Sequence, residues 1–237
     1  MASAFKWRHF SPDIILLCVR WYCRYSLSYR DLEEMMKERG LSVDHTTVYR
    51  WVQHYAPELE KRIQWYQNRQ SRSWRVDETY VKVRGEWKYL FRAITSDGRT
   101  LDFYLSNTRS TKAAKRFLSK AVRRAKHDRP SSITTDKNPA YIDAIRQLKV
   151  EGLIKPDCDH RRQKYLNNRI ECDHGGLKQR IRHVRGFQSK QTATATLKGF
   201  EVMRMFRKRQ FDGWLDAVAY GREACFIGRL FNVFIPV

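Results

Sequence analysis

The sequence predicts an all-α domain followed by a mixed α/β domain, and three observations support this fold class. Residues 1–67 carry helix-start signals and apolar residues at helical spacing. Residues 74–106 contain three segments rich in β-branched and aromatic residues, separated by short turns such as the one at Asp97-Gly98. After residue 106, amphipathic helical segments alternate with short apolar segments that are typical of strands. A mixed five-stranded sheet flanked by helices accounts for this second part.

The first domain is expected to contain a helix-turn-helix. Ser11-Pro12 begins the first helix and Ser28 the second, while Gly40 ends the second helix and Asp44 caps the third. Ordinary helical hairpins share this pattern, but the basic composition of the chain favours the DNA-binding interpretation. The polar residues of the third helix that face away from the core are the expected groove contacts: His45, Thr46, Thr47, Tyr49 and Arg50.

A polar segment predicts the boundary between the domains. Ala56-Pro57 predicts the start of a further helix that reaches about Gln67. Residues 68–73 lack apolar anchors, so they are expected to form a linker. The expected domains are therefore 1–67 for DNA binding and 74–209 for the catalytic sheet domain, followed by a tail, 210–237, without an assigned role.

The sheet domain is expected to begin with three consecutive antiparallel strands. Residues 74–83, 87–95 and 100–106 should pair in this order because short turns join them. A helix from Ser110 leads to a fourth strand within 131–135. The remaining expected elements are a helix after Asn138-Pro139, a short strand within 156–160, and helices from about Arg169 to His183 and from Ser189 to about Arg209.

The charge of the chain predicts a polyanionic partner. The net charge is +22, from 47 Lys and Arg against 25 Asp and Glu, and nucleic acid is the commonest partner of so basic a globular protein. An anionic membrane surface would call for a basic amphipathic anchor or a lipidation motif, and neither is recognisable. The five cysteines are irregularly spaced, which favours a reducing compartment over a disulfide framework. No signal peptide or long apolar run is evident, so a cytoplasmic protein is expected.

Three acidic residues stand at positions that suit metal-dependent chemistry. Asp77 lies on the first strand, Asp136 at the end of the fourth strand, and Glu171 in the first turn of a helix expected to face the sheet. The first and fourth strands are joined through a helix, so they can lie side by side and bring the two aspartates together. Three oxygen donors with open positions suit Mg²⁺ or Mn²⁺. Two such ions can activate an attacking oxygen and stabilise the leaving one in a phosphoryl displacement.

Each of these acids alone has an ordinary structural explanation. Asp77 could belong to a salt bridge, Asp136 could cap a helix, and Glu171 could be a favourable charge in a first helical turn. Lys178 follows Glu171 by seven residues, so it lies on the same face of the helix, where substrate phosphate would lie. Arg182 continues this face and is a further candidate for DNA contact.

Four segments of the sequence carry a resemblance to a known family. They are residues 28–51, Val76-Asp77-Glu78-Thr79-Tyr80-Val81-Lys82-Val83, Thr135-Asp136-Lys137 with Pro139-Ala140-Tyr141, and Asn168-Arg169-Ile170-Glu171-Cys172-Asp173-His174-Gly175 with Leu177-Lys178. The chain resembles the DDE transposases of bacterial insertion sequences, whose core is RNase H-like as in retroviral integrases. The similarity runs from about Phe5 to Arg209 and is closest to the cointegrate-forming insertion sequence family six. It implies that Asp77, Asp136 and Glu171 form the metal-binding catalytic triad and that Lys178 contacts DNA.

Several neighbouring residues invite other interpretations. Glu78 adjoins Asp77, but alternation along a strand sends it to the opposite face, so a minor role is expected. His174 falls on the apolar face of its helix and is expected to be a core histidine or a neighbour of the metal ligands. Cys158-Asp159-His160 and Cys172-Asp173-His174 lack the usual spacing of zinc ligands. No hydroxyl side chain is framed as the nucleophile of a serine or tyrosine recombinase.

The resemblance implies a transposase that binds the terminal inverted repeats of its element, hydrolyses the phosphodiester at the element ends and joins the freed 3′-OH to target DNA. It also implies replicative transposition through a cointegrate, and a synaptic complex of two or more protomers. Two alternatives remain, an RNase H-like DNA nuclease that cleaves without joining and a catalytically silent, transposase-derived DNA-binding regulator. The expected location is the bacterial cytoplasm, in association with the nucleoid.

Overall fold

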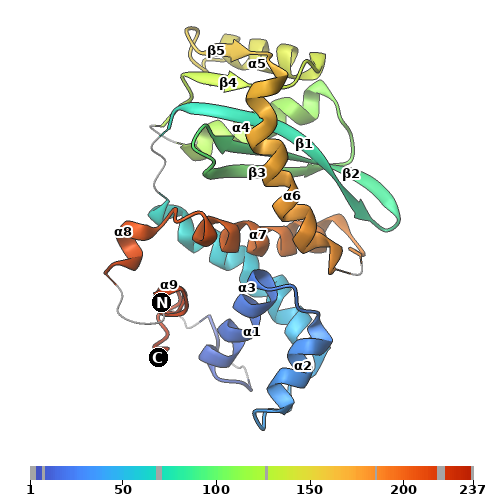
Figure 1. The fold of residues 1–237 in the computed structure, drawn as a ribbon, viewed down its shortest axis with the longest axis vertical. Coiled ribbons are helices and arrows are strands. Elements are labelled where there is room, and N and C mark those ends of the chain that lie inside the picture. The colour runs from blue at the N-terminus through green and yellow to red at the C-terminus, as the bar shows by residue number, and fades with distance from the viewer. Residues whose placement is uncertain are drawn as a thin grey trace. The chain divides into compact units, whose positions relative to one another are not determined.

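The computed structural model of the chain describes residues 4–6, 9–67, 71–125, 128–184, 186–217 and 222–235. The chain forms two compact units, which are labelled by element in Figure 1. A helical unit contains residues 1–68, 180–185 and 191–237, and a sheet unit contains residues 69–179 and 186–190. In the described part of the chain, no helix combines the length and the apolar character needed to cross a bilayer.

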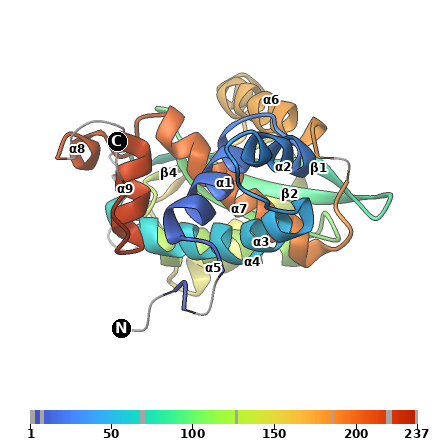
Figure 2. The same cartoon turned by 90° about the horizontal axis from the view of Figure 1, so that it is seen from below.

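Local signals set the first helices of the helical unit. The side chain of Ser28 accepts a hydrogen bond from the backbone N–H of Asp31, whose carboxylate accepts one from the N–H of Ser28, so the predicted capping box is present. Asp44 caps the next helix through the N–H of Thr46, as predicted. The helices α1, α2 and α3 lie side by side in both Figure 1 and Figure 2, and their bounds are Pro12–Arg24, Tyr29–Lys37 and His45–Ile63.

The predicted helix start at Ala56-Pro57 is wrong, because α3 continues unbroken from His45 to Ile63 with Pro57 inside it. A proline in a helix interior removes one backbone hydrogen bond and costs roughly 3 kcal/mol. Tyr55, Ala56 and Leu59 are all buried around it, and the packing of this stretch outweighs the local penalty. The turn after α3 is a short 3-10 helix, Gln64–Tyr66.

The C-terminal residues contribute to the core of the helical unit. Helix α7 (Lys190–Arg207) belongs to this unit from residue 191 onward. It packs closely against α3, because a Cβ atom added to Gly199 would lie only 2.9 Å from the Cβ atom of Ala56. The chain after residue 210, to which no role was assigned, forms α8 (Asp212–Leu215) and α9 (Arg222–Leu230). The ring of Phe211 lies 4.9 Å from the ring of Phe206 in α7, so this segment packs against the rest of the helical unit.

The sheet unit contains one mixed sheet with the strand order β3-β2-β1-β4-β5. Strand β1 pairs antiparallel with β2 and parallel with β4, so the predicted adjacency of the first and fourth strands is confirmed. The strands are β1 (Ser73–Val83), β2 (Glu86–Thr95), β3 (Thr100–Ser106), β4 (Ser132–Thr134) and β5 (Asp159–Arg161), and the helices are α4 (Thr111–Ala125), α5 (Pro139–Val150) and the first part of α6 (Asn168–Arg182).

Helices cover both faces of the sheet. The buried residues of α4 and α5, among them Phe117 and Tyr141, pack against Trp74, Val76 and Phe91 of the sheet. Helix α6 crosses the opposite face, as Figure 1 shows, where Asp77 and Arg92 point towards it. The observed sheet therefore confirms the predicted mixed five-stranded sheet flanked by helices.

Candidate active site

The site is built at an open edge of strand β1. Of strand β1, only the segment from Ser73 to Arg75 pairs with β4, and the chain leaves β4 after Thr134. Strand β1 continues to Val83, which forms an isolated bridge with Phe187, and in the described part of the chain the residues between Arg75 and Val83 have no strand beside them on that edge. Asp77 and Glu78 belong to this continuation, and Asp136 is the second residue after the end of β4. Side chains from both faces of β1 can therefore meet around its edge.

Three carboxylates gather at this edge. One ligand atom of each of Asp77, Glu78 and Asp136 lies within 4.8 Å of those of the other two. Among the described residues, this group leaves out Glu171, which is exposed in the first turn of α6. The structure thus brings together two residues of the predicted triad and adds Glu78, to which sequence reasoning gave a minor role. The position of Glu171 in the triad stays a prediction.

On the α6 face, Asp77 lies beside a buried histidine. His174 Nε2 is 3.4 Å from Asp77 Oδ2, and His174 Nδ1 is 3.1 Å from a guanidinium nitrogen of Arg92. Arg92 also donates to Asp173 at 2.6 Å, and only 1% of its side chain is exposed. Burial lowers the pKa of His174, although Asp77 acts in the opposite direction. These contacts fix the first half of α6 against the face that carries Asp77.

On the opposite face, Glu78 is held by a tyrosine and an arginine. The hydroxyl of the fully buried Tyr141 donates to Glu78 Oε2. Arg109 forms an ion pair with Glu78 Oε1 through Nε and donates to Asp136 Oδ2 at 3.0 Å through Nη2. Burial raises the pKa of the Glu78 carboxyl, while Tyr141 and Arg109 oppose that rise. One arginine therefore joins the buried carboxylate of Glu78 to the half-buried one of Asp136.

The backbone after β4 fixes the remaining oxygen of Asp136. Asp136 Oδ1 accepts a hydrogen bond from the N–H of Asn138 at 3.0 Å, and the side chain of Asn138 caps α5 at Ala140. A tight turn into a capped helix leaves the carboxylate of Asp136 little freedom. Asp136 thus stands at a defined position beside Asp77.

The donor set of this edge fits a hard divalent cation. Carboxylate oxygens that lie within 4.8 Å of one another are the ligands that Mg²⁺ and Mn²⁺ prefer, and the group contains no sulfur or nitrogen donor. Asp77, Glu78 and Asp136 are the residues that would hold such an ion. The thiol of Cys172 is exposed on α6 and lies outside the group.

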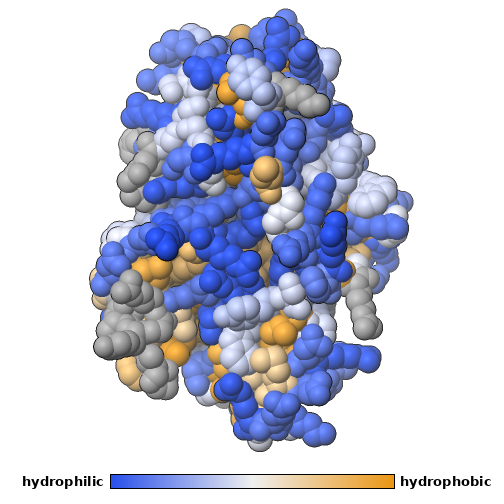
Figure 3. Space-filling model, viewed as in Figure 1, coloured by the Kyte–Doolittle hydropathy of each residue, from blue (hydrophilic) through white to orange (hydrophobic). Residues whose placement is uncertain are grey.

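The predicted DNA contacts of α6 are exposed. Lys178 lies on the part of α6 that belongs to the sheet unit, whereas Arg182 lies in the last turn, which is grouped with the helical unit. The face of the sheet unit visible in Figure 3 is predominantly hydrophilic. An exposed, polar face with basic side chains is compatible with a phosphate backbone.

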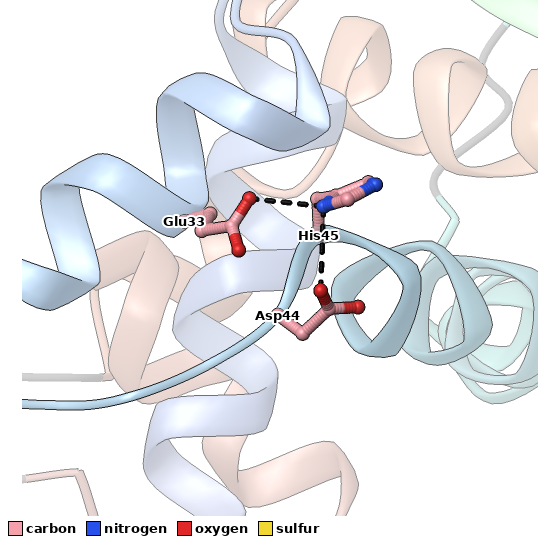
Figure 4. A group of neighbouring side chains, drawn as sticks. All are labelled: Glu33, Asp44 and His45. Atoms are coloured by element: carbon pink, nitrogen blue, oxygen red, sulfur yellow. Dashed lines mark hydrogen bonds and ion pairs between the residues drawn. The ribbon is translucent and has the colours of Figure 1, made fainter.

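The predicted recognition helix carries a charged cluster at its start. His45 Nδ1 lies 2.9 Å from Glu33 Oε2 on α2 and 3.4 Å from Asp44 Oδ2, as Figure 4 shows. Asp44 also caps α3 through Thr46. Glu33 therefore joins α2 to the start of α3, and Figure 4 shows the other side of the His45 ring turned away from both carboxylates. The exposed residues among the predicted groove contacts are Thr46, Tyr49 and Arg50, and His45 and Thr47 are half-buried.

Arg109 and Tyr141 are the site residues that sequence reasoning missed. Tyr141 lies in one of the segments that carry the family resemblance, and its place at the start of α5 was a usable signal. Arg109 had no comparable signal, because it is one of 47 basic residues and stands in the loop between β3 and α4.

The sequence of the chain matches a known domain family and curated transposases. The model of a DDE domain family, DDE_Tnp_IS240, matches residues 71–210. The chain is 41% identical over 205 residues to the transposase for the insertion sequence-like element IS431mec of Staphylococcus aureus, an alignment that covers 86% of this chain and 89% of that protein. It is 40% identical, with the same coverage, to the transposase for the insertion sequence element IS257 in transposon Tn4003 of Staphylococcus aureus.

Among solved structures, the catalytic core domain of HTLV-2 integrase in complex with magnesium, in its dimeric form, is similar with a TM-score of 0.36. Its sequence is 17% identical, and the alignment covers 45% of this chain and 66% of that one. The simian T-cell lymphotropic virus intasome in complex with a PP2A regulatory subunit is similar with a TM-score of 0.40 and 15% identity, covering 76% of this chain and 66% of that one.

Proposed function

This chain belongs to the DDE transposases of insertion sequence family six, and we propose from that premise that it cuts its element at the terminal inverted repeats and joins the ends to target DNA. It is a DDE-type DNA transposase. The observation that carries the proposal is the meeting of Asp77 and Asp136 from neighbouring parallel strands at one edge of the sheet. The two reactions are hydrolysis of the phosphodiester at an element end and attack of the freed 3′-OH on target DNA.

Asp77, Asp136 and Glu171 are the proposed catalytic residues. Asp136 is held by the N–H of Asn138 and by Arg109, and Asp77 by the strand and by its neighbour His174. Glu171 lies outside the carboxylate group, so its proposed role requires its side chain to move towards Asp77. Cys172 is exposed beside it and provides a place to attach a probe of that movement.

Divalent metal use follows from membership in the DDE family. Held by these carboxylates, two ions would activate the attacking oxygen and stabilise the leaving one. The residues of the chain then have to orient the scissile phosphate, and Lys178 and Arg182 are the proposed contacts on α6.

The helical unit is proposed to recognise the terminal repeats through α3. Thr46, Tyr49 and Arg50 are exposed on this helix, and His45 is joined to Glu33. We expect binding to weaken steeply with salt, by about 10³-fold or more between 50 and 200 mM, if six to ten phosphates are contacted. Electrophoretic mobility shift or fluorescence anisotropy over a salt series tests this. A flat response would contradict a broad DNA-binding surface.

The finer features of the reaction are also proposals. Transposition is replicative and proceeds through a cointegrate, and two or more protomers assemble on the two element ends. Because its substrate is chromosomal and plasmid DNA, the protein acts in the bacterial cytoplasm at the nucleoid. Mating-out assays that score fused plasmids test the first point, and size-exclusion chromatography with light scattering on paired repeat ends tests the second.

The central experiment incubates the purified chain with labelled terminal-repeat DNA and Mg²⁺, next to Asp77→Asn, Asp136→Asn and Glu171→Gln. The variants should still bind the ends, while nicking and joining fall by about 10³-fold or more, because several kcal/mol of charge stabilisation in the transition state are lost. Glu86→Gln is the matched control, since Glu86 is an exposed carboxylate paired with Lys88 at the β1–β2 turn.

The outcomes separate this function from its alternatives. A variant that keeps full nicking would remove its residue from the triad. Cleavage without joining, and without preference for repeat ends, would identify an RNase H-like nuclease. Tight binding with no cleavage by the unmodified chain would identify a DNA-binding regulator.

A further inference from the structure

Glu78 and Asp77 are consecutive residues of β1, so alternation along the strand directs them to opposite faces of the sheet. Their carboxylates nevertheless come within 4.8 Å of each other and of Asp136. The edge of β1 explains this meeting, because β4 ends at Thr134 and leaves room for both side chains to turn around the strand. Only 2% of the Glu78 side chain is exposed, which sets it apart from an ordinary surface acid.

Both oxygens of Glu78 have partners of different character. Tyr141 donates to Oε2, and its ring is fully buried between α5 and the sheet, so this contact is a fixed part of the core. Arg109 faces Oε1, and 39% of its side chain is exposed. The arginine is therefore the partner that can leave into solvent at little cost in packing.

Arg109 takes the place that a metal ion would take. A buried carboxylate is costly unless a cation compensates it, and one guanidinium spans Glu78 and Asp136. Three carboxylates against one guanidinium leave an excess of two negative charges at the edge. That excess attracts a divalent cation, and an ion can reach Glu78 Oε1 only after Arg109 has moved away.

We propose that Glu78 is a further carboxylate ligand of the divalent-metal centre, and that Arg109 is the resident cation that the metal displaces. This inference rests on the proposed metal-dependent function and adds a residue to its site. Tyr141 holds Glu78 in the orientation that presents Oε1 to Asp136. Displaced from the carboxylates, the guanidinium of Arg109 becomes available to a DNA phosphate at the same edge.

The test measures Mn²⁺ binding to the full, DNA-free chain by isothermal titration calorimetry. Glu78→Gln should weaken Mn²⁺ binding by about tenfold or more, as should Asp77→Asn and Asp136→Asn. Glu78→Asp keeps the charge but shortens the side chain, and it should weaken binding similarly if Glu78 is a ligand. Arg109→Gln should tighten binding by about tenfold, because it removes a cation from the site. Glu86→Gln is the control and should bind as the unmodified chain does.

Each result decides between distinct interpretations. Unchanged affinity in Glu78→Gln, or full affinity in Glu78→Asp, would overturn direct coordination by Glu78. Unchanged or weaker affinity in Arg109→Gln would overturn displacement, because it would mean that Arg109 only positions Asp136. If Asp77→Asn and Asp136→Asn lose affinity while Glu78→Gln does not, the proposed function stands and this inference fails. If those two aspartate variants also bind normally, the metal site of the proposed function fails.

Circular dichroism melts of every variant accompany the titrations. Glu78→Gln removes a charge from a buried position and can affect folding, but Arg109 is partly exposed and its variant tests the displacement independently. An Arg109→Gln variant that folds and binds Mn²⁺ more tightly supports the inference even where Glu78→Gln is unstable.

Discussion

Two arginines serve opposite faces of the same sheet, and they differ in burial. Arg92 is 1% exposed and is tied to Asp173 and His174 of α6. Arg109 is 39% exposed and is tied to Glu78 and Asp136. Both arginines neutralise carboxylates near Asp77. Glu78 and Asp136, the partners of Arg109, belong to the group of carboxylates whose oxygens lie within 4.8 Å of one another, and Asp173, the partner of Arg92, does not.

Burial decides what each arginine can do. The side chain of Arg92 is almost wholly buried, so its ion pair with Asp173 belongs to the packing between α6 and the sheet. Arg109 borders solvent, so its charge can be exchanged for another cation without opening the core. Arg92 therefore stabilises the fold, whereas Arg109 is a cation of the active site that another cation can replace.

Arg92→Met should have the largest effect on stability. It removes one partner of a buried ion pair and should lower the free energy of unfolding by about 3–5 kcal/mol. Urea denaturation followed by circular dichroism measures this loss, which should be the same with and without Mn²⁺. Arg109→Gln should lose less, and saturating Mn²⁺ should reduce its loss relative to the unmodified chain, since the tighter Mn²⁺ binding expected of this variant stabilises its folded state more than that of the unmodified chain. Recovery of Arg92→Met by Mn²⁺ would contradict the distinction between the two arginines.

Tyr141→Phe should have an intermediate effect. The ring packing is kept, but Glu78 loses a buried hydroxyl donor, which should cost about 1–3 kcal/mol. The variant should also bind Mn²⁺ more weakly, because Glu78 is no longer held towards Asp136. Tyr89→Phe is a suitable control, since Tyr89 is a partly buried tyrosine that packs against the same core. If the variant loses stability but binds Mn²⁺ as the unmodified chain does, Tyr141 stabilises the core and does not position Glu78 for the metal.

Most elements of the fold could be predicted because their determinants lie within a few residues. The capping box at Ser28, the turn at Asp97-Gly98 and the cap at Asn138 each set an element locally, and the structure has each element close to its predicted place. The adjacency of β1 and β4 also followed, since a helical crossover between strands favours parallel neighbours. The interior position of Pro57 did not follow, because packing between distant segments outweighed the local preference.

The site could be predicted only in part, for a geometric reason. Strand alternation is a reliable rule where a strand has neighbours on both sides, and it separated Glu78 from Asp77. It does not describe a strand edge that lies beyond the end of its neighbour, where side chains of both faces converge. Arg109 lies in a loop whose position depends on the whole sheet, so no pattern in the sequence singled it out among the basic residues.

The helical unit contains a more exposed ion pair than those of Arg92 and Arg109, between Glu33 and His45. Glu33 and His45 are 38% and 37% exposed, so their contact should contribute at most about 1 kcal/mol to stability. Glu33→Gln should therefore melt as the unmodified chain does, yet bind terminal-repeat DNA more weakly, because the ring of His45 loses the carboxylate that orients it. Competition between repeat and random DNA measures the effect. If Glu33→Gln binds repeat ends with the same affinity as the unmodified chain, the orientation of His45 by Glu33 does not contribute to recognition.

Substitution of Asp44 should produce the smallest effect, a change in how strongly stability depends on pH. Hydrogen bonds from the hydroxyl and the N–H of Thr46 lower the pKa of the Asp44 carboxyl in the folded chain. An acid whose pKa is lowered on folding contributes stability above its unfolded pKa and loses it as the pH falls through the lowered value. Asp44→Asn keeps a cap but does not titrate, so acidification should lower its melting temperature slightly less than that of the unmodified chain.

Asp44→Ala supplies the contrast, because it removes the cap at every pH. Its melting temperature should be lower than that of Asp44→Asn both at neutral pH and in acid, by a similar margin. Thermal melts followed by circular dichroism at a series of pH values measure both differences. Identical acid sensitivity of Asp44→Asn and the unmodified chain would mean that the charge of Asp44 adds nothing to its hydrogen bonds. Stability at the start of α3 would then depend on cap geometry alone, whereas at the edge of β1 the charges themselves hold Arg109 in place.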